Sequence, residues 1–225
     1  MGNFISYLLA PHRLPYFILL FLGIAIGGIR FKYLNRSSRV FFILLCTTLL
    51  NEIIGYLYKY ELKVGNNAGV YNTFTFIQFG LVCMGFYFQV MIRKYIIFTL
   101  IVFYAFAIFN AIFWQSFLIA SNSNTLLLES LFIIIWVMLF FTAFFRKIDN
   151  TPIYQFPLFW IGMGWLIFSI VSILSFGFYT LNELTPYWKN ISFWARALAN
   201  YLLYLSFIPA FLSPQKSLND PATGK

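Results

Sequence analysis

The chain of 225 residues has few charged side chains, only two cysteines and a single histidine. Charged residues make up 9% of it, whereas a soluble domain carries about 25%. So few charges cannot cover a surface that faces water, which excludes a soluble globular enzyme, a nucleic-acid-binding protein and a disordered chain. We therefore interpret the formal net charge of +9 through the distribution of its basic residues, which indicates membrane topology, and we expect no nucleic-acid partner.

The cysteines and the histidine cannot build a metal or haem site. Cys46 and Cys83 both lie in apolar stretches, and neither has another Cys or a His at metal-ligand spacing. His12 precedes the first apolar stretch and has no second histidine to act with. We therefore expect no metal and no cofactor, and we interpret the cysteines as small side chains that pack between helices.

Hydrophobic residues, by contrast, make up 61% of the chain, and aromatic residues alone make up 23%. About 20 apolar residues suffice for a helix to cross a bilayer. Seven apolar stretches occur, of which the first is short: Pro15–Ile29, Val40–Tyr58, Gly69–Ile92, Tyr95–Phe117, Asn124–Phe145, Phe156–Tyr179 and Ile191–Leu212. The sequence thus predicts an all-α fold, a polytopic bundle of seven transmembrane helices.

Lysine and arginine are distributed unequally between alternate connections of these stretches. One side of the membrane receives ten of them: Arg30, Lys32, Arg36, Arg39, Arg93, Lys94, Arg146, Lys147, Lys216 and Lys225. The other side receives four: Arg13, Lys59, Lys63 and Lys189. Because short cytoplasmic loops carry the excess of basic residues, we predict an N-terminus outside and a cytoplasmic C-terminus. Residues 1–213 form a single membrane domain in this interpretation, and residues 214–225 form a short cytoplasmic tail.

Three ionisable residues, Glu52, Glu129 and Arg196, lie within the predicted spans. An unpaired charge near the middle of a membrane helix costs at least about 2.5–3.5 kcal/mol, so these side chains should face the interior of the bundle. At about 1.5 Å of rise per residue, all three lie at a similar depth in the outer half. We therefore expect Arg196 to contact Glu52, Glu129 or both.

Other polar residues occupy the same layer and share helix faces with these three. Residues three or four positions apart lie on one face of a helix, as Arg196 and Asn200 do. The candidate ligand-binding pocket, open to the outside, comprises Glu52, Tyr71, Asn72, Gln78, Asn110, Glu129, Arg196 and Asn200.

Two interpretations of the buried charges stay open. In the first, Arg196 bridges the glutamates and only clamps the bundle, for which its planar guanidinium is suited. In the second, the residues form a chamber for a ligand or an ion. Two carboxylates for one guanidinium favour the chamber, because one carboxylate then remains to bind a proton, a cation or a donor.

Three segments resemble a group of small seven-helix proteins of bacteroidete bacteria. They are Tyr71–Phe79, Leu128–Ser130 and Pro157–Gly164, and the later stretch with Trp188, Asn190 and Asn200 also fits. The group often has Glu at the position of Gln78. The resemblance implies a multi-pass protein of the inner membrane of a Gram-negative bacterium, and it implies no activity and no catalytic residues.

The expected function is ligand binding or sensing by a receptor-like membrane protein that has no output domain of its own. Its candidate partners are the lipid bilayer, a small-molecule or lipid ligand, and a signalling protein in the membrane or cytoplasm. A transporter of a small solute or proton is one alternative. The other is an intramembrane enzyme acting on lipid, with Glu52 and Glu129 as acid and base. No nucleophile–base pair is visible, so the sequence favours a protein that is not an enzyme.

Overall fold

Seven long helices make up the computed structural model of the chain, which describes residues 7, 10–62, 64, 66–89, 93–118, 122–147, 152–180 and 185–216. The helices are α2 (Leu14–Ile29), α3 (Arg36–Tyr56), α4 (Ala68–Tyr87), α5 (Arg93–Phe113), α6 (Ser123–Lys147), α7 (Pro157–Thr180) and α8 (Pro186–Leu212). Short helical turns occur at η1 (Phe31–Tyr33), η2 (Leu57–Glu61) and η3 (Ile153–Gln155). The all-α, seven-helix prediction is confirmed for these residues.

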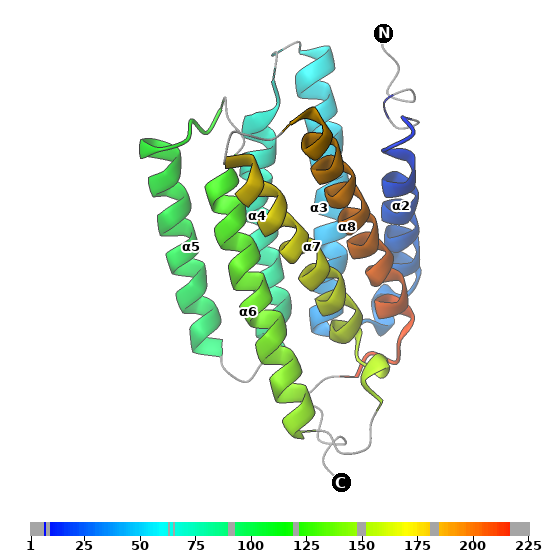
Figure 1. The fold of residues 1–225 in the computed structure, drawn as a ribbon. Helices are drawn as coiled ribbons and strands as arrows, with labels where there is room; N and C mark the ends of the chain where they lie inside the picture. The colour runs from blue at the N-terminus through cyan, green and yellow to red at the C-terminus, as the bar shows by residue number, and fades with distance from the viewer. Residues whose placement is uncertain are drawn as a thin grey trace.

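The helices run alternately down and up, and α2 begins at the opposite end of the bundle from the end of α8 (Figure 1). We call the end where α2, α4, α6 and α8 begin the upper end, and the other the lower end. Each helix packs against the next one in the chain, and α8 returns to α2 and closes the ring. Contacts of α3 with α7 and of α4 with α6 fill the middle.

Within the described part of the chain, five helices are long and apolar enough to cross a membrane, and they span Arg36–Glu61, Lys94–Phe113, Ser123–Arg146, Pro157–Gly177 and Tyr187–Leu212. The apolar helix α2 has 16 residues and is about 24 Å long, shorter than the hydrocarbon core of about 30 Å. The helix α4 has 20 residues but is not one of these five helices, and it carries the polar side chains of Asn72, Thr75 and Gln78. By length and hydropathy the chain is therefore a multi-pass membrane protein.

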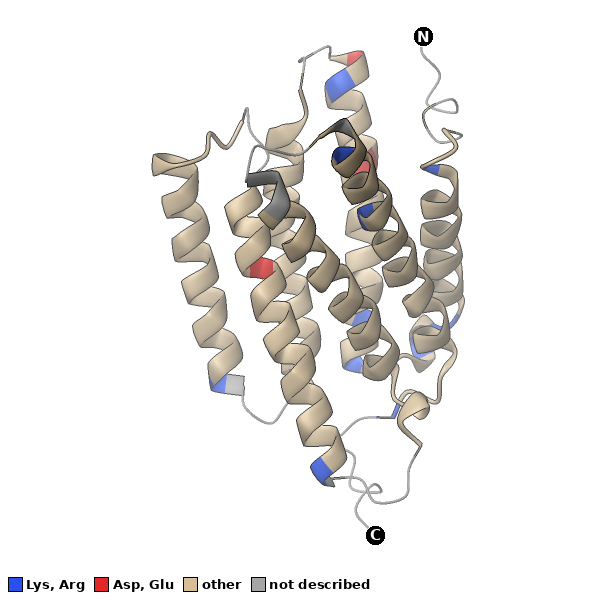
Figure 2. Ribbon diagram, viewed as in Figure 1, with Lys and Arg blue, Asp and Glu red and all other residues tan. Residues whose placement is uncertain are grey.

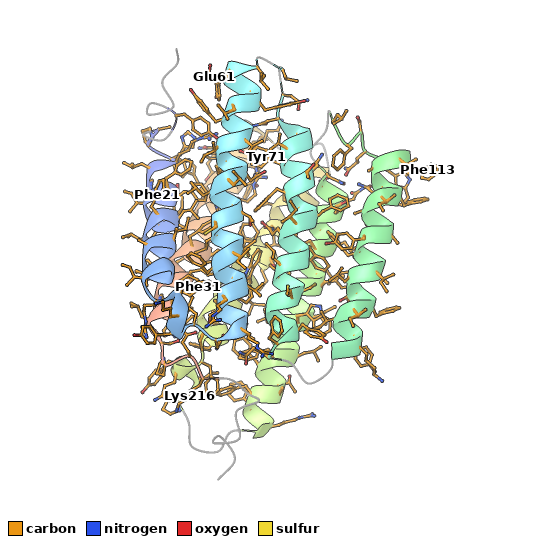
Figure 3. All side chains as sticks on the ribbon, turned by 180° about the vertical axis from the view of Figure 1, so that it is seen from behind. Phe21, Phe31, Glu61, Tyr71, Phe113 and Lys216 are labelled. Carbon is orange, nitrogen blue, oxygen red and sulfur yellow. The ribbon has the colours of Figure 1, made fainter. Side chains whose placement is uncertain are left out.

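The outer faces of the helices are apolar, as a lipid environment requires. Phe21 on α2 is 48% exposed and Phe113 on α5 is 67% exposed, and both project from the bundle (Figure 3). The core of the lower half consists of large aromatic side chains, among them Phe41, Phe86 and Phe211. Apolar side chains thus cover the outside of the bundle and also fill the interior of its lower half.

Glycines allow the closest helix approaches. A Cβ on Gly27 of α2 would lie 2.5 Å from the ring of Phe42 on α3 and 3.0 Å from that of Phe211 on α8. A Cβ on Gly164 of α7 would lie 2.9 Å from that of Ser206 on α8. These helices can therefore approach only because no side chain separates them.

The ends of the helices differ from the predicted apolar stretches by a few residues. The fourth stretch was expected to continue to Phe117, but α5 ends at Phe113 because the amide groups of Trp114 and Gln115 both donate to the carbonyl of Asn110 and the chain turns. The third stretch was expected to reach Ile92, whereas α4 ends at Tyr87. Residues 217–225 of the expected tail, and Lys63 among the counted basic residues, lie outside the described part of the chain.

Candidate functional site

The eight predicted pocket residues fall into three separate groups. Glu52, Tyr71, Arg196 and Asn200 line one cavity at the upper end. Gln78 and Glu129 form a hydrogen-bonded pair between α4 and α6. The remaining two, Asn72 and Asn110, belong to a network of amides beside α4, α5 and α6. The structure therefore places the residues of the predicted pocket in three groups, of which one lines a cavity.

The cavity has a volume of about 610 Å³ and lies between α2, α3, α4, α7 and α8. We call it the upper pocket, and it is lined by His12, Arg13, Tyr16, Glu52, Tyr71, Phe168, Phe193, Arg196, Ala197, Asn200 and Tyr201. Ligand pockets commonly measure about 300–1,000 Å³ and combine an apolar wall with a few polar groups. The upper pocket matches this description in both size and lining.

Three tyrosine hydroxyls hold the carboxylate of Glu52. Tyr7 and Tyr71 each donate to Oε2 at 3.2 Å, and Tyr16 donates to Oε1 at 3.3 Å. Burial, and then the Glu52 carboxylate, raise the pKa of Tyr7, so its hydroxyl remains a proton donor at neutral pH. Glu52 is thereby fixed on the pocket wall by donors from the segment before α2, from α2 and from α4.

Arg196 does not form the predicted ion pair: among the described residues, none joins it to Glu52 or Glu129. Its Nε donates to the carbonyl of Ser192 at 3.4 Å, and its guanidinium lies 5.2 Å from the ring centre of Phe176. Tyrosine hydroxyls donate to the carboxylate of Glu52, and a glutamine donates to that of Glu129, where the arginine was expected as the partner. An Arg196 clamp between the two glutamates is thus absent from the described structure.

Glu129 lies apart from the upper pocket, on α6, and is only 2% exposed. Gln78 on α4 donates to its Oε1 at 2.8 Å. Gln78 also lines a small internal cavity together with Thr48 and Tyr204. Tyr204 packs edge to face on Tyr16, with ring centres 5.0 Å apart, so polar side chains continue from the upper pocket toward Glu129.

The amide network closes the upper end beside α5 and α6. Asn110 is fully buried, donates to Gln115 Oε1 at 3.1 Å and also to Asn122 Oδ1, and accepts from Asn124 Nδ2 at 3.0 Å. Asn72 on α4 joins the network, because its Oδ1 accepts from the backbone amide of Asn122 at 3.1 Å. These side chains bond mainly to one another, so we assign them a structural role.

The sequence prediction missed several residues of the upper pocket. Arg13 precedes α2, and its guanidinium lies 4.0 Å from the ring centre of Tyr7. The hydroxyl of Tyr201 donates to the carbonyl of His12 at 2.5 Å and ties α8 to the start of α2. Arg13 had been counted only as a loop charge. Its position directly before a short first span was the signal that it could lie near the membrane-embedded polar layer.

The described residues contain no group of three or more His, Cys, Asp or Glu side chains that could hold a metal ion. Among the described residues, basic side chains are most numerous at the lower end of the bundle and some also lie in its upper half, whereas the acidic ones lie between the upper end and the middle (Figure 2). The upper pocket is lined by charged side chains of both signs, Arg13, Arg196 and Glu52.

Comparison with protein families, with curated proteins and with solved structures finds no match to this chain. The seven-helix architecture that the resemblance implies is confirmed by the fold, and no family is identified. From its helices and their hydropathy, the chain is a helical, multi-pass integral membrane protein.

Proposed function

We propose that the protein is a receptor-like membrane protein that binds a small molecule in the upper pocket. The observation that carries this proposal is the cavity of about 610 Å³, whose described lining includes two guanidiniums, a carboxylate and an amide. Polar and charged groups within a membrane are costly and mark functional sites. A protein that needed only to be stable could fill this volume with leucine or phenylalanine.

Proton transport is the second candidate, supported by the polar side chains that continue past Tyr204 and Gln78 to Glu129. Below this level the core is packed with Phe41, Phe86, Phe207 and similar side chains, so a route to the lower end has little support. An enzyme that uses Glu52 and Glu129 as acid and base is disfavoured, because Glu129 is not among the residues that line the pocket.

A pocket-filling variant tests the proposed function. We expect native mass spectrometry of the protein, extracted from its membrane in mild detergent, to show a retained small molecule that the variant Ala197→Trp loses, because indole fills the pocket. Leu198→Trp is the matched control, since Leu198 is the next residue on α8 and is 58% exposed on the outer face. Retention of the same molecule by Ala197→Trp, or its absence from the wild type, would contradict the proposal.

We further propose that the upper end faces outward from the inner membrane of a bacterium and that the lower end is cytoplasmic. The excess of basic residues at the lower end supports this orientation (Figure 2). Alkaline phosphatase fused after Lys63 should be active, because that enzyme needs the oxidising exterior, whereas fusions after Lys147 and Lys225 should be inactive. Fusions of green fluorescent protein at the same sites should give the opposite pattern, and an active phosphatase at Lys225 would refute the orientation.

A further inference from the structure

Basic side chains lie close together in the connection between α2 and α3, at the lower end of the bundle. Residues 30–39 contain four of them and no acidic residue: Arg30, Lys32, Arg36 and Arg39. In the whole sequence, the ten basic residues assigned to this end are accompanied by two acidic ones in the same segments, Asp149 and Asp220. Positive charge therefore predominates at the lower end when every residue of the chain is counted.

The segment after α8 is joined to the same connection by hydrogen bonds. The backbone amide of Asn35 donates to Oε1 of Gln215 at 3.4 Å, and its Nδ2 donates to the carbonyl of Gln215 at 3.2 Å. The next residue, Lys216, is thereby held beside the start of α3, and Figure 3 labels it at the lower end together with Phe31. We call Arg30, Lys32, Arg36, Arg39 and Lys216 the lower basic patch.

Backbone carbonyls hold two guanidiniums of the patch in place. Arg39 donates from Nε to the carbonyl of Leu34 at 2.9 Å and from Nη2 to that of Lys32 at 3.1 Å. Arg30 donates from Nη1 to the carbonyl of Leu212 at 2.6 Å. A guanidinium has five N–H donors, so both keep donors for a further partner. The acceptors are neutral carbonyls, so these bonds order the two side chains and leave their positive charge in place.

Exposed apolar side chains border the patch. Ile29 at the end of α2 is 82% exposed, Tyr33 of η1 is 75% exposed, and the guanidinium of Arg39 lies 5.4 Å from the ring centre of Phe31. Because α2 is shorter than the hydrocarbon core, the residues that flank it lie close to the bilayer surface, where basic side chains extend toward the head groups. The patch thus lies where head groups meet acyl chains.

From these observations we infer that the lower basic patch binds the phosphate head groups of anionic phospholipids, in the leaflet that the lower end reaches. Phosphate oxygens accept paired hydrogen bonds from a guanidinium and single ones from an ammonium. Clusters of four or more basic residues beside a membrane helix are typical of anionic-lipid binding. Ile29 and Tyr33 contact the apolar part of the same lipids. This site is separate from the upper pocket, and it does not depend on the ligand proposed there.

The test uses the full chain, freed of lipid in mild detergent, with added dioleoyl phosphatidylglycerol or dioleoyl phosphatidylcholine. The two lipids have the same acyl chains, and only the first carries a net negative charge. Native mass spectrometry should show more retained phosphatidylglycerol than phosphatidylcholine, and phosphatidylglycerol should raise the midpoint of thermal unfolding further. This difference in midpoint should shrink as salt is added, because salt screens exposed charges. Inorganic phosphate at the same concentration should not stabilise the protein, since it has no acyl chain.

A double variant shows whether the preference comes from the patch. Lys32 and Arg36 are exposed, and in the described part of the chain their side chains make no hydrogen bond, so their replacement should leave the fold intact. Each basic residue near an anionic surface contributes about fivefold in affinity, so Lys32→Gln together with Arg36→Gln should weaken binding of phosphatidylglycerol by about 25-fold. The matched control is Lys59→Gln together with Lys189→Gln, which removes the same charge from exposed positions at the upper end and should change nothing.

Equal retention of the two lipids by the wild type, or an undiminished preference in the double variant, would overturn the inference. The same loss in the upper-end control would show that the net charge of the protein decides the preference, and would also overturn it. Stabilisation by inorganic phosphate equal to that by phosphatidylglycerol would assign the patch to a free anion instead of a lipid. If the double variant fails to fold, Lys32→Gln alone still decides, with a loss of about fivefold expected.

Discussion

Replacing Gly164 with alanine is expected to destabilise the bundle by about 1–3 kcal/mol, the usual cost of overpacking a tight core. The added Cβ would lie 2.3 Å from Oγ of Ser206, 2.9 Å from its Cβ and 3.2 Å from the backbone Cα of Leu203. Rotation of the Ser206 side chain can relieve the first contact. The other two involve atoms that move only with α8, so α7 and α8 must separate.

This separation should also disturb the upper pocket, because α8 carries Arg196, Asn200 and Tyr201. The matched control is Gly177→Ala on the same helix, where an added Cβ meets no atom of the described residues within 4 Å. Alanine favours a helix over glycine by up to about 1 kcal/mol, so the control should be neutral or slightly stabilising. Thermal unfolding of both variants in detergent measures the difference. Equal midpoints would show that the α7–α8 contact is less tight than the structure has it.

The helices were predictable because each corresponds to an apolar stretch of the sequence with a distinct boundary. Arg146 and Lys147 end α6, and Pro157 begins α7 at the first position of the helix, where proline costs no hydrogen bond. The hydropathy of a span depends only on its own residues. For this reason the number and the limits of the helices follow from local sequence to within a few residues.

The site was predicted only in part, because helix periodicity shows which residues share a face but not which helix that face meets. Glu52 and Glu129 lie at similar depth, and depth alone suggested that one or both of them contact Arg196. In the structure Glu129 is on α6, which packs against α4, α5 and α7, and Gln78 reaches it from α4. The pairing of α2 with α8, which brings Arg13 and Arg196 to one cavity, depends on the closure of the ring.

The tyrosines around Glu52 were missed for a different physical reason. A tyrosine in an apolar stretch contributes a large ring and a single hydroxyl, so composition does not distinguish packing from hydrogen bonding. Tyr56 lies one turn after Glu52 on α3, yet the hydroxyls that bind Glu52 come from Tyr7, Tyr16 and Tyr71. Of these, only Tyr71 was among the predicted site residues.

Substitution of Asn110 by leucine is expected to lower the free energy of unfolding by about 2–4 kcal/mol. Each buried polar group that loses its hydrogen-bond partner costs about 1–3 kcal/mol, and Asn110 has more than one such partner. Asn110 is fully buried at the upper end of α5. Leucine has a similar volume and fills the site, but it leaves Nδ2 of Asn124 without its acceptor and removes the donor to Gln115 and Asn122. These hydrogen bonds join the end of α5 to the start of α6. The outer face of α5 consists of exposed Ile and Phe side chains, which do not pack against other helices.

The measurement for this prediction is thermal unfolding together with proteolysis of the α5–α6 connection in detergent. Asn190→Leu is the control, because Asn190 is exposed on α8 and makes no contact in this network, and it should leave both readouts unchanged. Binding to the upper pocket should survive in the fraction of Asn110→Leu that remains folded, since the network and the pocket share no residue. Loss of binding from well-folded Asn110→Leu would mean that the amide network acts on the ligand site, and the structural role assigned to Asn110 would then be wrong.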